Sequence, residues 1–215
     1  MTLDEKIGQM IITGFNGSEY NDDMDRLINE YKVGGVILFA RNIEDSNQMI
    51  DLTRALQENN NNLPLFISID EEGGRVSRLP DDVEKFPSAF TIGLINNQQT
   101  AYENGKEIGY TLKRLGINLD YAPVLDIYSN ENNTVIGDRA FSKEESIVST
   151  MGIATMEGIE DADIIPVVKH FPGHGDTEVD SHYGLPIVYK TLEELRNFEF
   201  IPFVKAIESG CDVIM

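Results

Sequence analysis

The stretch "LFISID" at 65–70 decides the fold class, because a continuous apolar run here ends in a carboxylate. Strands buried on both faces of a parallel sheet have such continuous runs, whereas half-exposed strands alternate. Five further short runs of this kind lie along the chain: "MIITGF" at 10–15, "GGVILF" at 34–39, "INLDYAPVLDI" at 117–127, "IIPVVKH" at 164–170 and "DVIM" at 212–215. The sequence therefore predicts six buried parallel strands.

Longer amphipathic segments separate these runs. The segment 45–58 has a helical repeat with one apolar face, formed by Met49, Ile50, Leu52, Thr53 and Leu56. Further helices are expected at 101–115, after the capping-box sequence "TLEE" at 191–194, and from Pro202 to just before Gly210. This alternation predicts an α/β fold with a parallel sheet. Six strands fit either a small doubly wound sheet or the first part of a (β/α)8 barrel.

The charge balance restricts the kinds of partner. The chain carries 17 basic and 37 acidic residues, a formal net charge of −20, which repels nucleic acid and anionic membranes. No apolar run approaches the ~18 residues that span a bilayer, and "MTLDEKIGQM" at 1–10 has no signal-peptide pattern. We therefore expect no nucleic acid partner and no membrane insertion. The chain as given would be cytoplasmic, or exported if a preceding segment is missing.

Polar side chains follow three of the predicted strands. Asp70 closes one run, Asp126 closes a second, and Lys169 with His170 close a third. Open α/β sheets and barrels both place their ligand sites at the carboxyl ends of strands. These side chains are therefore expected to share a functional site.

Arginines in two glycine-containing loops are further candidates. Gly73 and Gly74 permit a tight turn that would carry Arg75 and Arg78 back over the strand ends. Arg139 lies in a similar loop, "NNTVIGDRAF". Solvated surface arginines would give the same pattern. No glycine-rich run followed by Lys-Ser or Lys-Thr is present, so the sequence does not favour nucleotide binding.

The segment "KHFPGHGDTEVDSHYGLP" at 169–186 holds all three histidines of the chain. Its proline and glycines would break a helix, so His170 and His174 are not a helical pair of metal ligands. A loop metal site would need further ligands: Asp176, Asp180 and His182. Because no recognised ligand spacing is present, we expect neither a metal nor another cofactor.

Asp180 and His182 suggest a more specific function. In an extended segment, residues two apart point to the same side, so the Asp180 carboxylate could accept a hydrogen bond from one ring nitrogen of His182. The other nitrogen would then face a substrate. Such a pair suits a proton donor and acceptor that works near neutral pH. An exposed turn is the alternative interpretation.

Six motifs taken together resemble the family 3 glycoside hydrolases, and most closely their bacterial β-N-acetylglucosaminidases: "LDEKIGQM", "GGVILFARNI", "IDEEGGRVSRL", "APVLDIYSN", "VIGDRAF" and "KHFPGHGDTEVDSHYGLP". The last of these is the most specific. The resemblance covers essentially the whole chain, so residues 1–215 correspond to the N-terminal portion of that family's catalytic barrel domain. Glu71 stands where glutamine is also frequent.

The resemblance implies a (β/α)8 barrel, truncated here after about six β/α units. It further implies a retaining exo-β-N-acetylglucosaminidase that acts on peptidoglycan or chitin-derived fragments in cell-wall recycling, with no cofactor. His182 would be the general acid/base and Asp180 its partner. Five residues would line the sugar subsite: Asp70, Arg78, Arg139, Lys169 and His170. His174 would shape the loop and touch the substrate, and Asp126 and Asp176 would support these side chains from behind.

The family's nucleophilic aspartate follows a later strand, downstream of this sequence. We therefore expect residues 1–215 alone to be inactive. Three other functions remain open: a phosphorylase of the same family, a sugar-binding protein without catalysis, and a metal-dependent hydrolase.

Overall fold

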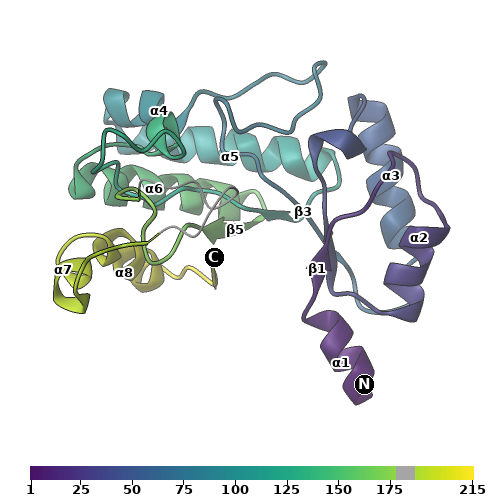
Figure 1. The fold of residues 1–215 in the computed structure, drawn as a ribbon. Coiled ribbons are helices and arrows are strands. Elements are labelled where there is room, and N and C mark those ends of the chain that lie inside the picture. Colours follow the sequence, from purple (N-terminus) through teal and green to yellow (C-terminus); the bar gives the residue numbers. More distant parts are fainter. Residues whose placement is uncertain (178–186) are drawn as a thin grey trace.

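A computed structural model of the chain describes residues 1–177 and 187–215. Within them, six parallel strands form one sheet in the order β1-β2-β3-β4-β5-β6. The strands are β1 (Ile12–Thr13), β2 (Gly35–Ile37), β3 (Phe66–Ile69), β4 (Leu119–Asp120), β5 (Ile165–Val168) and β6 (Val213–Ile214). A doubly wound sheet reverses its strand order, whereas a barrel keeps the order of the sequence. The chain is therefore the first part of a barrel, and Figure 1 shows the sheet curling between its helices.

Two long helices follow their predicted positions closely: α3 (Ser46–Glu58) and α5 (Gln98–Arg114). A third long helix, α6 (Glu145–Asp161), was not predicted from the sequence. The Asp45 side chain caps α3 by accepting a hydrogen bond from the Gln48 N–H. The predicted capping box of Thr191 and Glu194 is confirmed at the start of α7 (Leu192–Arg196). The helix α8 (Phe200–Glu208) begins two residues before Pro202, which still lies in the first turn, where its missing N–H costs no helical hydrogen bond.

Shorter elements complete the chain: α1 (Leu3–Gln9), α2 (Asp22–Asp25), a π-helical turn at Arg26–Glu30, 3-10 turns at Ala40–Asn42 and Gly137–Arg139, and α4 (Ala89–Ile95). In the described ranges, no helix is both long enough and apolar enough to cross a bilayer.

Two glycines allow α5 and α6 to pack at close range. A Cβ atom on Gly105 would lie 2.2 Å from the Thr155 carbonyl oxygen, and one on Gly158 would lie 2.1 Å from that of Tyr102. The two helices thus pack backbone against backbone beside the sheet (Figure 1). The α6 helix also packs against β5, the strand that Lys169 follows.

The predicted strands are longer than the observed ones. In the run 117–127 only Leu119 and Asp120 belong to β4, and a single bridge between Val124 and Lys169 continues the contact with the next strand. Pro123 interrupts the ladder because it has no N–H to donate. Asp126 therefore lies in an extended segment beyond β4, not at its end.

Candidate active site

A cleft of about 530 Å³ opens at the carboxyl ends of the strands. Six of the side chains expected to contact a sugar line it: Asp70, Arg78, Arg139, Lys169, His170 and His174. They come from the segments that follow β3, β4 and β5 and from the 3-10 turn Gly137–Arg139. Among these six side chains, residues as far apart in the sequence as Asp70 and His174 thus meet in one cavity.

Lys169 is the most deeply buried of these side chains, with 1% of its surface exposed. Its Nζ lies 2.8 Å from Asp70 Oδ1 and 2.6 Å from Glu72 Oε1. A buried ammonium needs such partners because it has lost its hydration. Two carboxylates therefore hold the Lys169 charge at the floor of the cleft.

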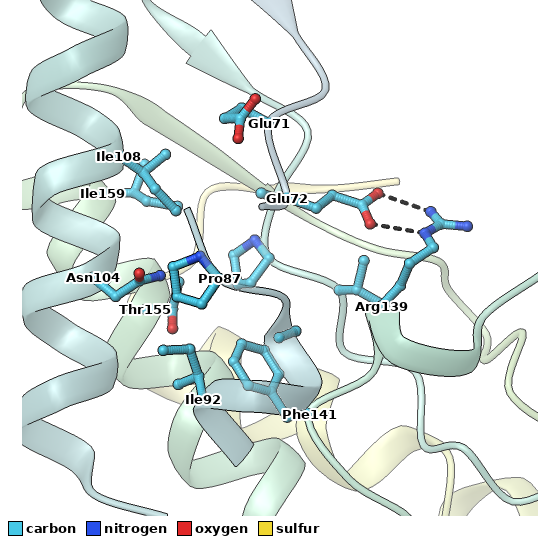
Figure 2. Close-up of a pocket in the computed structure, with 14 residues that line it drawn as sticks. Glu71, Glu72, Pro87, Ile92, Asn104, Ile108, Arg139, Phe141, Thr155 and Ile159 are labelled. Carbon is cyan, nitrogen blue, oxygen red and sulfur yellow. Dashed lines mark hydrogen bonds and ion pairs between the residues drawn. The ribbon is translucent and has the colours of Figure 1, made fainter. Parts of the chain in front are cut away.

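Glu72 also binds Arg139 through two parallel hydrogen bonds. Arg139 Nε and Nη2 lie 2.8 Å from Glu72 Oε2 and Oε1, and both bonds are drawn in Figure 2. Burial disfavours the charged carboxylate, but the hydrogen bonds and charges of Arg139 and Lys169 outweigh it, so the pKa of Glu72 lies below its ordinary value. Sequence reasoning missed Glu72. The sequence feature that could have identified Glu72 is its position two residues after Asp70, because side chains two apart in an extended chain point to the same side.

The contacts of His170 identify its tautomer. Its Nε2 lies 3.1 Å from Arg139 Nη2, and its Nδ1 lies 2.5 Å from Asp126 Oδ2. A guanidinium only donates, so Nε2 accepts and Nδ1 carries the hydrogen that it donates to Asp126. His170 is thus held between a donor and an acceptor.

Asp126 is fully buried and supports both histidines from behind the cleft. Besides His170 Nδ1, it accepts hydrogen bonds from the backbone N–H of His170 at 3.3 Å and of His174 at 2.6 Å. One carboxylate therefore fixes the ring of His170 and the backbone of the loop that follows it.

His174 lines the cleft and has one ring nitrogen without a partner among the described residues. Thr177 Oγ1 donates to the His174 carbonyl at 3.0 Å, so it accepts from His174 Nδ1 at 2.5 Å. Nε2 is then an acceptor, and it has no partner among the described residues although it is buried. A hydroxyl or amide N–H of a ligand would satisfy it.

The two arginines of the "EEGGRVSR" loop have different positions. Gly73 and Gly74 both adopt positive φ, as the predicted tight turn requires, and Arg78 lines the cleft. Arg75 instead pairs with Asp138 at 2.7 Å and donates to carbonyls of residues 134–136. Arg75 therefore anchors the loop that carries Arg139 and is not itself in the cleft.

Two further carboxyls lie behind the cleft. Glu71 and Asp120 are completely buried, and each has one side-chain oxygen with no partner in the described part of the chain. Burial raises the pKa of both groups above the ordinary carboxyl value. In Figure 2 the Glu71 side chain lies apart from the Glu72–Arg139 pair.

Asp180 and His182 lie outside the described residues. Asp176, near the end of the first described range, forms an ion pair at 3.0 Å with Lys190, near the start of the second. Lys190 also forms an ion pair with the buried Glu199. Over residues 1–177 and 187–215, no group of three or more His, Cys, Asp or Glu side chains is arranged to hold a metal ion.

Comparison with known proteins gives one consistent result. Residues 2–215 match the family model described as "Glycosyl hydrolase family 3 N terminal domain". Beta-hexosaminidase A of Pseudoalteromonas piscicida is 40% identical over 87% of this chain and 33% of its own length. Beta-hexosaminidase of Thiobacillus denitrificans is 38% identical over 93% of this chain and 56% of its own.

Solved structures agree. A glycoside hydrolase family 3 β-N-acetylglucosaminidase from Paenibacillus sp. matches all of this chain and 41% of its own, with a TM-score of 0.97 and 43% identity. NagZ from Neisseria gonorrhoeae, in complex with N-trifluoroacetyl-D-glucosamine, matches 95% of this chain and 62% of its own, with a TM-score of 0.89 and 29% identity. The chain thus spans between a third and about three fifths of these relatives.

Proposed function

This chain belongs to glycoside hydrolase family 3, and on that basis we propose that the protein containing it is a retaining exo-β-N-acetylglucosaminidase. The observation that carries the proposal is the cleft in which Asp70, Lys169 and Arg139 meet at the carboxyl ends of the strands. The relatives named as hexosaminidases or β-N-acetylglucosaminidases support it.

The polar groups of the cleft suit a sugar ring. Asp70 offers carboxylate oxygens to vicinal hydroxyls, and Lys169 and Arg139 are fixed donors. His174 Nε2 adds an acceptor that a hydroxyl or an acetamido N–H would satisfy. An N-acylated glucosamine is bound in the Neisseria relative, and we infer the same class of ligand here.

His182 would protonate the glycosidic oxygen, and Asp180 would orient its ring and stabilise the imidazolium form. A nucleophilic aspartate supplied by the remainder of the protein would form the glycosyl-enzyme. His182 would then take a proton from the attacking water. Terminal N-acetylglucosamine of peptidoglycan or chitin-derived fragments is the proposed substrate.

The test compares the full-length gene product with its His182→Ala variant on two substrates, p-nitrophenyl N-acetyl-β-D-glucosaminide and chitobiose. Loss of a general acid/base should cost about two to four orders of magnitude in rate. The loss should be larger for chitobiose, because its leaving hydroxyl needs protonation more than p-nitrophenol does.

Each of the other possible results would indicate a different mechanism or function. Equal activity of the two proteins would disprove the role of His182. Faster loss of substrate in phosphate buffer, with a sugar 1-phosphate as product, would indicate a phosphorylase. Loss of activity on prolonged chelation would indicate a metal-dependent hydrolase. Two inert proteins that still bind N-acetylglucosamine in calorimetry would indicate a binding protein.

A further inference from the structure

We propose that Glu72 is the positioning residue of the cleft, whose one buried carboxylate aligns both Lys169 and Arg139 for the sugar. The proposal rests on the proposed function and assigns work to a side chain that the sequence did not single out. Only 3% of the Glu72 side chain is exposed, and both of its oxygens are used. Oε1 accepts from Lys169 Nζ and Arg139 Nη2, and Oε2 accepts from Arg139 Nε.

Within residues 1–177 and 187–215, the hydrogen bonds of Arg139 and Lys169 leave each of these cations one N–H donor for a ligand. Arg139 uses Nε and one Nη2 proton on Glu72, the second Nη2 proton on His170, and one Nη1 proton on the Val135 carbonyl. Lys169 uses two of its three protons on Asp70 and Glu72. Among the described residues, one Nη1 proton and one Nζ proton remain without an acceptor, and both side chains line the cleft.

Removing the whole Glu72 carboxylate would take a hydrogen-bond partner from Lys169 and from Arg139 at once. Lys169, with 1% exposure, would keep Asp70 as its single charged partner among the described residues, and would compete with the sugar for the Asp70 oxygens. Arg139 would lose the two bonds that set the plane of its guanidinium. Its contact with His170 Nε2 depends on that plane, so the effect would spread to a third cleft residue.

The Glu72→Gln variant tests this with little change in shape. The glutamine amide oxygen can replace Oε1 and keep the hydrogen bonds from Lys169 Nζ and Arg139 Nη2. The glutamine NH2 group would then face the Arg139 Nε–H. Two donors would oppose each other, so Arg139 should rotate while Lys169 stays. We expect kcat/KM for the p-nitrophenyl substrate to fall by about 10- to 100-fold, the value of one charge-assisted hydrogen bond.

Glu71→Gln is the matched control, because Glu71 is the adjacent residue, is also buried and does not line the cleft. We expect it to keep wild-type kcat/KM. A double-mutant cycle separates positioning from a general loss of structure. If Glu72 acts through Arg139, Glu72→Gln combined with Arg139→Gln should cost little more than Arg139→Gln alone. Additive losses, or equal losses in Glu71→Gln and Glu72→Gln, would overturn the proposal.

A crystal structure of the Glu72→Gln full-length protein tests the positioning independently of turnover. If Arg139 keeps its place in the variant, the proposal fails whatever the activity. If Arg139 is displaced but the wild-type enzyme is inert, only the proposed function is rejected. If the Glu72→Gln protein does not fold, the Arg139→Lys variant is used instead. Lysine keeps the positive charge but cannot form the two parallel hydrogen bonds that the guanidinium makes to Glu72. Loss of 10-fold or more in kcat/KM then supports the alignment, and wild-type kcat/KM refutes it.

Discussion

Replacing Asp126 with asparagine should destabilise the protein and change the tautomer of His170. Asp126 is fully buried and accepts from His170 Nδ1, His170 N and His174 N. Asparagine keeps one oxygen, which can accept the hydrogen bond from the His174 backbone N–H. The asparagine NH2 group would then face His170 Nδ1–H. If the ring shifts its hydrogen to Nε2 to avoid this clash, that hydrogen meets Arg139 Nη2, which also donates. One donor is left without an acceptor in either case.

The magnitude follows from that lost bond. A hydrogen bond to a charged group contributes about 1.5–3 kcal/mol, and a buried donor left unpaired costs about 1–3 kcal/mol. We therefore expect a loss of about 2–3 kcal/mol. For a protein of 150–250 residues each kcal/mol shifts the Tm by about 2–4 °C, so the Tm should fall by about 4–12 °C.

The assay is thermal unfolding by calorimetry at pH 7, with Asp138→Asn as the control. Asp138 pairs with Arg75 at the surface, where an ion pair contributes about 0–1 kcal/mol, so this variant should melt close to the wild type. Long-range proton–nitrogen spectra of protein labelled with ¹⁵N-histidine report the His170 tautomer. Equal melting of the two variants, together with an unchanged Nδ1–H tautomer, would refute the reasoning.

Three further predictions follow from the described residues. Burial raises the pKa of Glu71, so the folded state holds its proton more tightly than the unfolded state does, and the stability it contributes falls as pH rises above the ordinary carboxyl range. Glu71→Gln should therefore gain stability over the wild type between pH 4 and pH 7 in urea unfolding, and parallel pH profiles would contradict this. Gly158→Ala should lower the Tm by several degrees because its Cβ would lie 2.1 Å from the Tyr102 carbonyl oxygen, whereas the exposed Glu160→Ala should not; equal Tm values would show that the helices can separate at no cost. The 215 residues alone should not cleave p-nitrophenyl N-acetyl-β-D-glucosaminide, and turnover above a His182→Ala control would contradict the need for a downstream nucleophile.

The sequence predicts the class of fold and part of the cleft, because burial leaves a pattern along the chain. Asp70 and Lys169 close apolar runs, so a rule about strand ends finds them without any knowledge of three-dimensional contacts. Arg139 lies in a loop without a periodic pattern, and the family resemblance was needed to single it out.

Other features depend on tertiary contacts that no local pattern records. Apolar runs report burial and not pairing, so the run 117–127 predicts a long strand where Pro123 permits only Leu119–Asp120. Arg75 and Arg78 are equivalent in the sequence, but Asp138 draws only Arg75 away from the cleft. Glu72 is one of two adjacent glutamates, and only the positions of Lys169 and Arg139 distinguish it from Glu71.

The two outer strands, β1 and β6, each pair on one side only in the described part of the chain. The side chains proposed to recognise the sugar lie between these edges, whereas the proposed nucleophile would lie in a different stretch of the polypeptide. The proposal therefore divides the nucleophile from the sugar-binding and acid/base side chains along the gene. We expect the two parts to be inert when produced separately, and glycosidase activity that returns on mixing would report their association.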